Sequence, residues 1–208
     1  MASQRKSSPT NPRASIGRWA GLCLIILAFY ILIRLFQDPI SHEIRYANHR
    51  TQSQSVLTPT NTEFALTIDK IGASAQIIQS VDPNNSQQYQ YALRDGVAHA
   101  RGTSLPGHGG NIFLFAHSSA DLLTAERYNS VFYLMHHLEE GDQIKVWYKG
   151  QQYDYYVTEK QVVSPRDTQY LGNTYTDETL TLMTCWPPGT TFKRLIILAR
   201  PRSSLNFP

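Results

Sequence analysis

The strongest constraint on the fold is an alternation of apolar and polar residues that begins at Phe64 and returns in short segments along the chain. A period of two is typical of β-strands with one buried face, and continuous apolar runs are typical of strands buried on both faces. Segments with one of these patterns are residues 64–69, 75–79, 112–116, 144–148, 153–157, 159–163, 179–184 and 195–199. Eight short strands in about 140 residues predict a mainly β domain that closes, or nearly closes, into a barrel.

Helical periodicity is brief by comparison. It is confined to residues 87–93 and 125–138, so we expect only short helices between the strands. Gly-rich and Pro-rich stretches such as residues 102–110 mark loops. The sequence contains no internal repeat, no phosphate-binding glycine loop with its lysine and no paired metal-ligand spacing.

An apolar segment lies before the β-rich part of the chain. Residues 16–36 are mostly apolar and reach the ~20 residues that a helix needs to cross a bilayer. Four basic residues and no acidic ones lie before the uninterrupted apolar run of this segment: Arg5, Lys6, Arg13 and Arg18. Because basic flanks stay cytoplasmic, we expect a cytoplasmic tail at 1–15 and an uncleaved single-pass transmembrane anchor at 16–36. A cleaved signal peptide is the alternative, but its apolar part is usually ~7 to 15 residues and ends at small residues.

The rest of the chain is expected on the extracytoplasmic side, as a polar stalk at 37–62 and a folded domain at 63–208. Residues 1–60 contain seven Lys or Arg and two Asp or Glu, whereas residues 61–208 contain twelve and fourteen. The net charge of +3 therefore comes from the part that flanks the predicted membrane span. This distribution favours a membrane protein over a nucleic-acid-binding protein.

The two cysteines belong to different parts of this plan. Cys23 lies inside the predicted span, so Cys185 would be the only cysteine of the exported part, and a disulfide framework is excluded. Cys185 ends the alternating segment 179–184, in which we expect Thr184 to face the barrel interior and Cys185 the opposite face. From this residue alone, an inert buried cysteine and a nucleophile at a strand end both remain open.

Two further residues favour the nucleophile. His117 follows the apolar run 112–116, and Arg194 opens the last apolar strand after a Pro-Pro-Gly turn at 187–189. If the strands on either side of that turn are neighbours, Arg194 lies near Cys185. An arginine can lower the pKa of a thiol or bind a carbonyl oxygen that gains negative charge, and a histidine can carry the proton.

These segments resemble the sequence blocks of the sortase family, the membrane-anchored cysteine transpeptidases of bacterial surfaces. TLTLMTC, which ends at Cys185, resembles the TLxTC signature of the family, and NIFLFAH, which ends at His117, resembles the strand that delivers its catalytic histidine. A family arginine follows within one hairpin, as Arg194 does. The segments IDKIGASAQI, GVAHARGTSLPGHGGN and LEEGDQIKVWYKGQQYDYYV are similar to other blocks in order, so the resemblance covers nearly all of 64–200. One departure is Ala116, where a glycine commonly precedes the histidine.

The resemblance implies an eight-stranded sortase-type β-barrel with Cys185 as nucleophile, His117 as general acid and base, and Arg194 as the oxyanion-binding or substrate-orienting group. It implies a cysteine transpeptidase that cleaves an LPxTG-like C-terminal sorting signal through a thioester acyl-enzyme. The surface protein is then transferred to an amine on the cell envelope, such as a cell-wall precursor or a pilin lysine. Further residues expected to contact substrate are Thr184, Ala116 and Ser118. We expect no cofactor and no metal, because the acidic residues that could bind calcium have no spacing that demands it; they are Asp167, Asp177 and Glu178.

Other interpretations remain. A pilin-polymerising sortase is one, although the Asp-Pro pair at 38–39 abuts the predicted span and lacks the aromatic residue of the family's lid motif. A cysteine L,D-transpeptidase would carry a glycine beside the cysteine, where this chain has Thr184. An anchored binding barrel without catalysis would have an unreactive Cys185. LPGHG at 105–109 resembles a sorting signal, but its position in mid-domain predicts a loop.

His136 and His137 are a further candidate pair, in the predicted helix 125–138. Adjacent positions on a helix point in different directions, so a joint metal site is not expected there. We expect these two histidines to lie on a solvated face.

Overall fold

The structure, a computed structural model, describes residues 21–31, 56–59, 61–118, 131–172 and 175–204. The chain divides into two units, Met1–Ser41 and His42–Pro208. Residues 21–31 of the first unit are helical, whereas the tail 1–15 and the rest of the predicted span 16–36 lie outside the described residues. No helix among the described residues combines the length and apolar composition that crossing a membrane requires.

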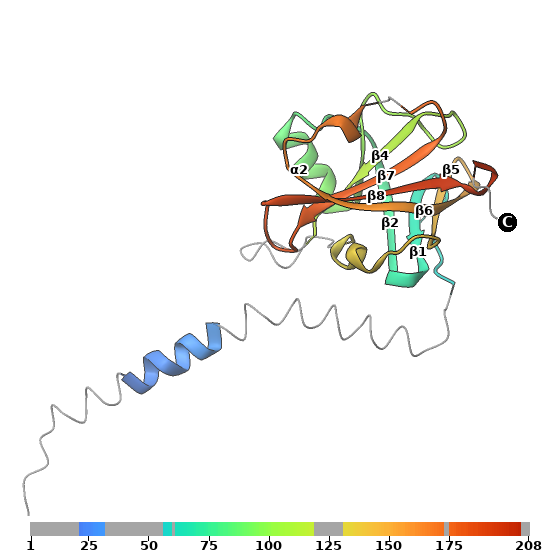
Figure 1. Cartoon of the computed structure of the whole chain (residues 1–208). Coiled ribbons are helices and arrows are strands. Elements are labelled where there is room, and N and C mark those ends of the chain that lie inside the picture. The colour runs from blue at the N-terminus through green and yellow to red at the C-terminus, as the bar shows by residue number, and fades with distance from the viewer. Residues whose placement is uncertain (1–20, 32–55, 60, 119–130, 173–174, 205–208) are drawn as a thin grey trace, which may run out of the picture. The chain divides into compact units, whose positions relative to one another are not determined.

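The second unit is mainly β (Figure 1). Its strands are β1 (Phe64–Ile68), β2 (Ala73–Val81), β3 (Val97–Ala100), β4 (Asn111–Phe115), β5 (Gln143–Tyr148), β6 (Gln151–Val163), β7 (Thr179–Trp186) and β8 (Lys193–Pro201). Its helices are α2 (Ser86–Asp95) and the 3-10 helices η1 (Asp69–Ile71), η2 (Tyr133–His137), η3 (Gln169–Leu171) and η4 (Arg202–Ser204).

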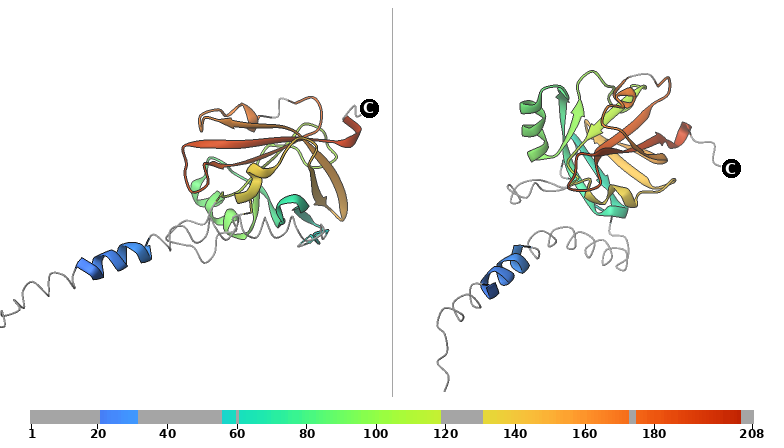
Figure 2. Two further views of the ribbon diagram at one scale, coloured as in Figure 1. Left: turned by 60° about the horizontal axis from the view of Figure 1, so that its bottom comes forward. Right: turned by 60° about the vertical axis from the view of Figure 1, so that its left-hand side comes forward.

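The strands close into a barrel in the order β1-β2-β3-β4-β7-β8-β6-β5, as the sequence predicts (Figures 1 and 2). The pairs β2–β3 and β4–β7 are parallel, and all other neighbours are antiparallel. The C-termini of β1, β4, β6 and β7 therefore meet at one end of the barrel, which we call the Cys185 end. The loop 102–110 between β3 and β4 lies at the other, which we call the Gly109 end.

Two strand predictions are wrong in detail. β3 is missing from the predicted set, because all four of its residues are buried and its short sequence VAHA does not alternate. β6 is one strand, where the sequence predicts two at 153–157 and 159–163. The register of β6 against β8 shifts between Val157 and Glu159. A bulge there reverses which side chains face the core, so one strand has the sequence pattern of two.

The helix predicted at 87–93 is confirmed as α2. The Asn85 side chain caps its first turn by accepting a hydrogen bond from the Gln88 N–H at 3.1 Å. The helix ends at Gly96, where a Cβ atom would lie 2.3 Å from the carbonyl oxygen of Gln76, so only glycine permits this approach to β2. The helix predicted at 125–138 is described only from residue 131, where it is the 3-10 helix η2 and not an α-helix.

Both faces of β4 are buried, as its continuous apolar sequence predicts. Phe113 and Phe115 alternate with Ile112 and Leu114, and the Tyr89 ring of α2 packs on Phe115 with ring centroids 6.4 Å apart. The phenylalanines therefore lie on the outer face of the barrel, beneath α2, and Ile112 and Leu114 face the interior.

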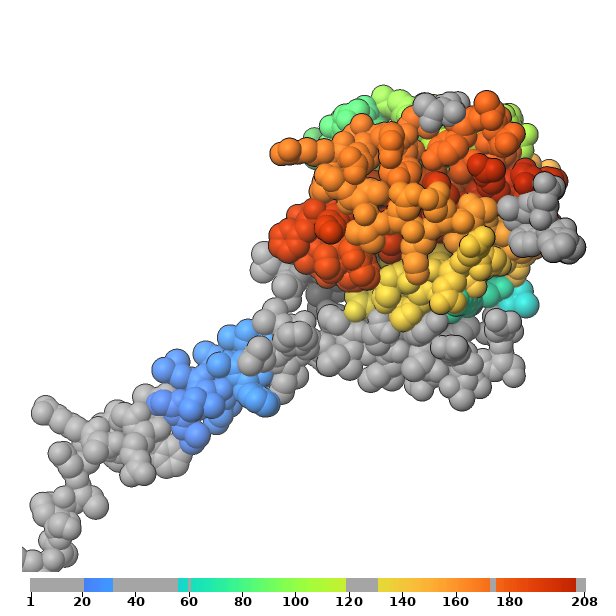
Figure 3. Space-filling view, viewed as in Figure 1, coloured from blue at the N-terminus to red at the C-terminus, as the bar shows by residue number. Residues whose placement is uncertain are grey.

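The connection from β6 to β7 passes outside β8, because β6 and β7 are parallel and both pair with β8. Fully buried Asn111 binds it to the barrel: its Nδ2 donates to the carbonyl oxygens of Tyr170 at 2.7 Å and Gly172 at 3.0 Å. The Asn111 Oδ1 accepts from the Thr181 hydroxyl of β7 at 2.7 Å. In Figure 3, the orange and red parts of the chain, which include β6 and the β7–β8 hairpin, cover the face toward the viewer.

Candidate active site

Cys185 and Arg194 are direct cross-strand partners beside the turn that joins β7 to β8. They form the last pair but one of the antiparallel ladder, before Trp186 and Lys193. Opposite residues of an antiparallel pair have Cα atoms about 4.5 to 5.5 Å apart and side chains on the same face. The prediction that the Pro-Pro-Gly turn returns Arg194 to the side of Cys185 is therefore confirmed.

His117 follows β4, the neighbour of β7 on its other side. The parallel pairing of β4 with β7 keeps one constant offset along residues 111–115, and the same offset aligns His117 with Cys185. His117 also continues the alternation of Phe113 and Phe115, which puts it on the outer face of the barrel. Cys185 therefore lies between the chain positions of a histidine on one side and an arginine on the other.

Two hydrogen bonds hold the chain before His117 against β7. The Ala116 N–H donates to the Met183 carbonyl oxygen at 3.2 Å, and the Thr184 hydroxyl donates to the Ala116 carbonyl oxygen at 2.9 Å. Both bonds lie beyond the last regular pair of β4 with β7. They extend the contact of the two strands to the level of His117.

The side chains of this end differ in exposure. Cys185 is a free thiol with partial exposure, and His117 is partly exposed with its Nε2 atom shielded from solvent. Thr184 is buried, so the expectation that Thr184 faces inward and Cys185 lies on the opposite face agrees with the structure. Cys23, the other cysteine, is exposed on the helix at 21–31.

The Arg194 guanidinium is oriented by the backbone of the turn. Its Nη1 donates to the carbonyl oxygens of Thr191 at 3.1 Å and Lys193 at 3.0 Å. The remaining donors make no hydrogen bond within the described residues. A guanidinium with one edge fixed and donors to spare can bind an oxygen that gains negative charge.

The three residues expected to contact substrate besides these are all buried: Ala116 is 6% exposed, Ser118 4% and Thr184 2%. Thr184 and Ala116 bind each other through the hydrogen bond described above. Their burial favours support of the strands that carry Cys185 and His117, and direct contact of these side chains with substrate remains a prediction.

The acidic residues considered as calcium ligands have other contacts. Glu178 accepts from the Tyr155 hydroxyl at 2.7 Å and from the Gly109 N–H at 3.1 Å. Burial, with the Glu178 carboxylate beside it, raises the pKa of Tyr155 well above its usual range, so its hydroxyl stays protonated and donates. Asp167 accepts from the Ser164 N–H at 2.9 Å within a local turn. Among the described residues, no three His, Cys, Asp or Glu side chains come together as metal ligands.

One contact near Cys185 has no signal in the sequence. The ring of His136, from η2, lies 5.3 Å from the ring of Trp186, the residue after Cys185. Fifty positions separate the two residues, and neither belongs to a periodic pattern that points to the other. His136 and His137 are both only partly exposed, so the prediction of a solvated face holds in part. Their rings lie 4.1 Å apart, so the expectation that they point in different directions is wrong.

The fold is a closed β-barrel, and its site places a partly exposed cysteine between a histidine and an arginine. Fold and site together define a barrel protein with a cysteine-centred site. The family model of the sortase domain matches residues 66–202 of this chain. The chain therefore belongs to the sortase family.

Individual relatives agree with this assignment. Sortase D of Bacillus subtilis (strain 168) is 28% identical over 138 residues, which make up 65% of this chain and 61% of that protein. The chain thus spans less than two thirds of the length of that relative. A pilus-related sortase C of Group B Streptococcus is 25% identical, with a TM-score of 0.56 over 70% of this chain and 69% of that one. Sortase D5 of Clostridium perfringens shares the fold at 22% identity, with a TM-score of 0.54 over 77% of this chain and 93% of that one.

Proposed function

We propose that this chain is a cysteine transpeptidase that cleaves an LPxTG-like C-terminal sorting signal and joins the substrate protein to an amine on the cell envelope. The observation that carries the proposal is the row across β4, β7 and β8, in which Cys185 pairs with Arg194 and shares its level with His117. Membership of the sortase family supports the same reaction class.

In the first half of the reaction, the thiolate of Cys185 attacks the carbonyl carbon of the scissile peptide bond. The Arg194 guanidinium, on the same face as the thiol, stabilises the negative charge on the carbonyl oxygen. His117 then protonates the departing amine, the C–N bond breaks, and a thioester remains on Cys185.

In the second half, an amine acceptor attacks the thioester carbonyl, and His117 removes its proton. The C–S bond breaks and a new amide forms, which returns Cys185 to the thiolate and leaves His117 protonated for the next cycle. Atoms and charge balance without a cofactor or metal, because the reaction exchanges one amide for another. Thr184 and Ala116 contribute by fixing the strand ends that carry Cys185 and His117.

The proposed location is the outer side of the cell membrane, with residues 16–36 as a single-pass anchor and the N-terminus in the cytoplasm. The basic residues before the apolar segment support this orientation. A fusion of a periplasm-sensitive reporter to residue 208 should be active if the domain is exported, and activity of a cytoplasm-only reporter there would contradict the orientation.

The experiment for the activity uses the full chain in detergent with a library of LPxTG-like peptides. We expect a peptide mass added to Cys185 as a thioester, released by hydroxylamine, and complete loss of this adduct in Cys185→Ala, which has no thiol at this position to acylate. Cys23→Ser is the matched control, because it removes the other thiol and should keep full adduct formation. A folded protein that forms no adduct with any peptide would sink the proposal. An unreactive Cys185 towards iodoacetamide at neutral pH would then favour a binding barrel without catalysis.

A second candidate acceptor is the side-chain amine of a pilin lysine. The similarity to a pilus-related sortase C favours this variant of the reaction. Competition between a diaminopimelate-type or glycine-type wall peptide and a lysine-containing pilin peptide distinguishes the two acceptors. Faster thioester resolution by the pilin peptide indicates polymerisation, and faster resolution by the wall peptide indicates anchoring.

A further inference from the structure

Cys185 lies at a strand end whose regular pairing is complete on one side only. The regular pairing of β7 with β4 stops at Met183, two residues before the cysteine. Beyond that point β7 is bound to β8 by backbone pairing and to β4 by the bonds at Ala116.

Trp186 is a side chain that is packed at this strand end. Alternation places it on the face opposite Cys185, and it packs against the hydrophobic core with partial exposure. The His136 ring lies 5.3 Å from it with an interplanar angle of 48°, and the His137 ring lies 4.1 Å from that of His136. Aromatic pairs at such distances stabilise each other beyond the area that they bury.

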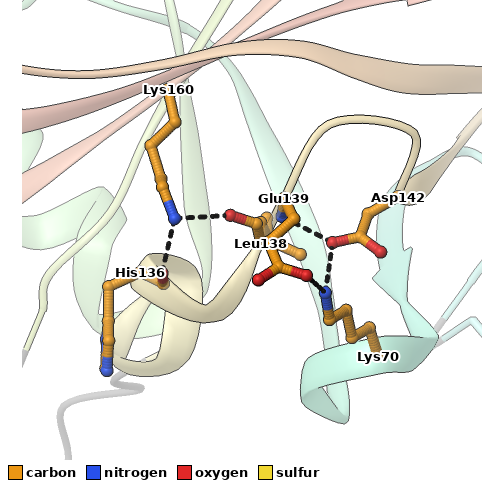
Figure 4. A network of polar contacts seen from close by, with 6 residues as sticks. All are labelled: Lys70, His136, Leu138, Glu139, Asp142 and Lys160. Carbon is orange, nitrogen blue, oxygen red and sulfur yellow. Dashed lines mark hydrogen bonds and ion pairs between the residues drawn. The ribbon is translucent and has the colours of Figure 1, made fainter.

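The element that presents His136 is held from outside. η2 has five residues and no side-chain cap at its N-terminus, and helices of this kind have little stability of their own. The Lys160 ammonium of β6 donates to the carbonyl oxygens of His136 at 3.0 Å and Leu138 at 2.9 Å (Figure 4). Carbonyl groups at the end of a helix have no partner within it, so this lysine satisfies two of them.

A second lysine fixes the chain just after η2. Lys70 of η1 lies 3.1 Å from the Glu139 carboxylate and 2.7 Å from that of Asp142 (Figure 4). Leu138, between the two lysine contacts, is fully buried. η2 is thus bound on one side to β6 and on the other to η1.

We propose that Lys160 and His136 are positioning residues for the nucleophile. Lys160 fixes η2, η2 presents the His136 ring to Trp186, and Trp186 fixes the end of β7 that carries Cys185. The effect on turnover rests on the proposed transpeptidase activity, whereas the effect on the thiol does not.

The experiment uses the full chain with Cys23→Ser, which leaves Cys185 as the only thiol. In this background, the rate of Cys185 alkylation by iodoacetamide is measured as a function of pH. His136→Ala and Lys160→Met should each change this rate at least threefold. With a peptide that the parent cleaves, kcat should fall about tenfold with KM within twofold, because a misplaced reacting atom lowers the rate of chemistry more than binding.

Conservative variants separate positioning from mere loss of stability. His136→Phe keeps a ring against Trp186, and Lys160→Arg keeps a donor near the two carbonyl groups, so both should restore most of the alkylation rate and kcat. His108→Ala and Lys149→Met are matched controls, because both residues are exposed at the Gly109 end. Both controls should stay within twofold of the parent.

Four outcomes decide the proposal. The proposal is overturned if His136→Ala and Lys160→Met change the alkylation rate and kcat no more than the controls do. It is also overturned if neither conservative variant restores the alkylation rate and kcat. If the parent cleaves no peptide but the alkylation pattern and its rescue hold, the positioning role stands and the proposed function fails. If Lys160→Met does not fold, His136→Ala and its rescue by His136→Phe decide alone.

Discussion

The two ends of the barrel each carry a histidine, and the barrel uses the two in different ways. At the Gly109 end, His99 is 2% exposed, and its Nε2 donates to the Ser104 carbonyl oxygen at 2.9 Å while its Nδ1 accepts from the Ser80 N–H. Burial lowers the pKa of His99, so it is neutral near pH 7. At the Cys185 end, His117 is partly exposed beside a free thiol.

The charged groups of the two ends differ in the same way. At the Gly109 end, both carboxylate oxygens of Glu178 accept hydrogen bonds, one from the buried hydroxyl of Tyr155 and one from the N–H of Gly109. Arg194 at the Cys185 end binds two turn carbonyl groups through one nitrogen only. Groups whose hydrogen bonds are satisfied within the fold stabilise it, and groups with donors to spare can act on a ligand. Changes at the Gly109 end should therefore lower stability, and changes at the Cys185 end should lower activity.

The sharpest test of this difference replaces His117. His117→Ala should lower the rate of acylation by about a thousandfold, because general acid and base catalysis typically contributes ~10² to 10⁴. The measurement is single-turnover formation of the Cys185 thioester by mass spectrometry, with thermal unfolding alongside. His99→Ala is the matched control at the other end and should keep the rate per folded molecule. An equal loss of rate in both variants would remove the distinction between the two ends.

Replacing Arg194 should have the next largest effect. Arg194→Ala should lower kcat by about 10² to 10³, the usual result of removing one oxyanion donor, while the midpoint of thermal unfolding stays close to that of the parent. Lys193→Ala is the matched control, because Lys193 is exposed and faces the other side of β8. Equal activities of the two variants would contradict an oxyanion role for Arg194.

The Cys185 end is the part of the fold that the sequence predicts best. The alternation to Thr184 and the short Pro-Pro-Gly turn are local patterns, and together they determine that Cys185 and Arg194 share a face. The apolar run before His117 likewise predicts a strand whose end carries the histidine. Local period and turn chemistry were sufficient for the pairing of Cys185 with Arg194, since these residues are joined by one short turn. The alignment of His117 with Cys185 depends instead on the pairing of β4 with β7, which are distant in the chain.

The parts that the sequence does not predict depend on distant contacts. β3 is stabilised by pairing with β2 and β4, and its His99 is satisfied by Ser80 from another strand. The bulge in β6 appears only as a shift of register against β8. The contact of His136 with Trp186 joins elements fifty positions apart. No local pattern carries these contacts, because they form only when the barrel closes.

The pH dependence of stability sharpens the comparison from the Gly109 end. His99 has a folded-state pKa below its unfolded value of about 6.5, so the unfolded chain binds the proton more tightly. The stability from neutral His99 is therefore fully present above pH 6.5 and is lost as the pH falls towards the folded pKa. His99→Gln should lower the free energy of unfolding at pH 7.5 by about 1 to 3 kcal/mol, because buried partners lose hydrogen bonds.

The same variant should also flatten the dependence on pH. Urea unfolding at pH 7.5 and pH 5.5 measures the loss for the parent and for His99→Gln, and the variant should lose less. His108→Gln is the matched control, since His108 is exposed and should keep the loss seen in the parent. Equal losses in His99→Gln and the parent would show that other groups govern the acid side.

The smallest expected effect comes from the hydroxyl of Tyr155. Tyr155→Phe removes the 2.7 Å hydrogen bond to Glu178 and should lower the free energy of unfolding by about 1 to 2 kcal/mol. Because Glu178 also holds the Gly109 N–H, hydrogen exchange should rise along residues 102–110, while kcat stays within twofold of the parent. Tyr153→Phe on the same strand is the matched control, because its hydroxyl makes no hydrogen bond within the described residues. Equally fast exchange in both variants would mean that the hydrogen bond to Glu178 is not what holds the loop. A fall in kcat with Tyr155→Phe alone would mean that the Gly109 end is coupled to the reacting residues and that the two ends do not act separately.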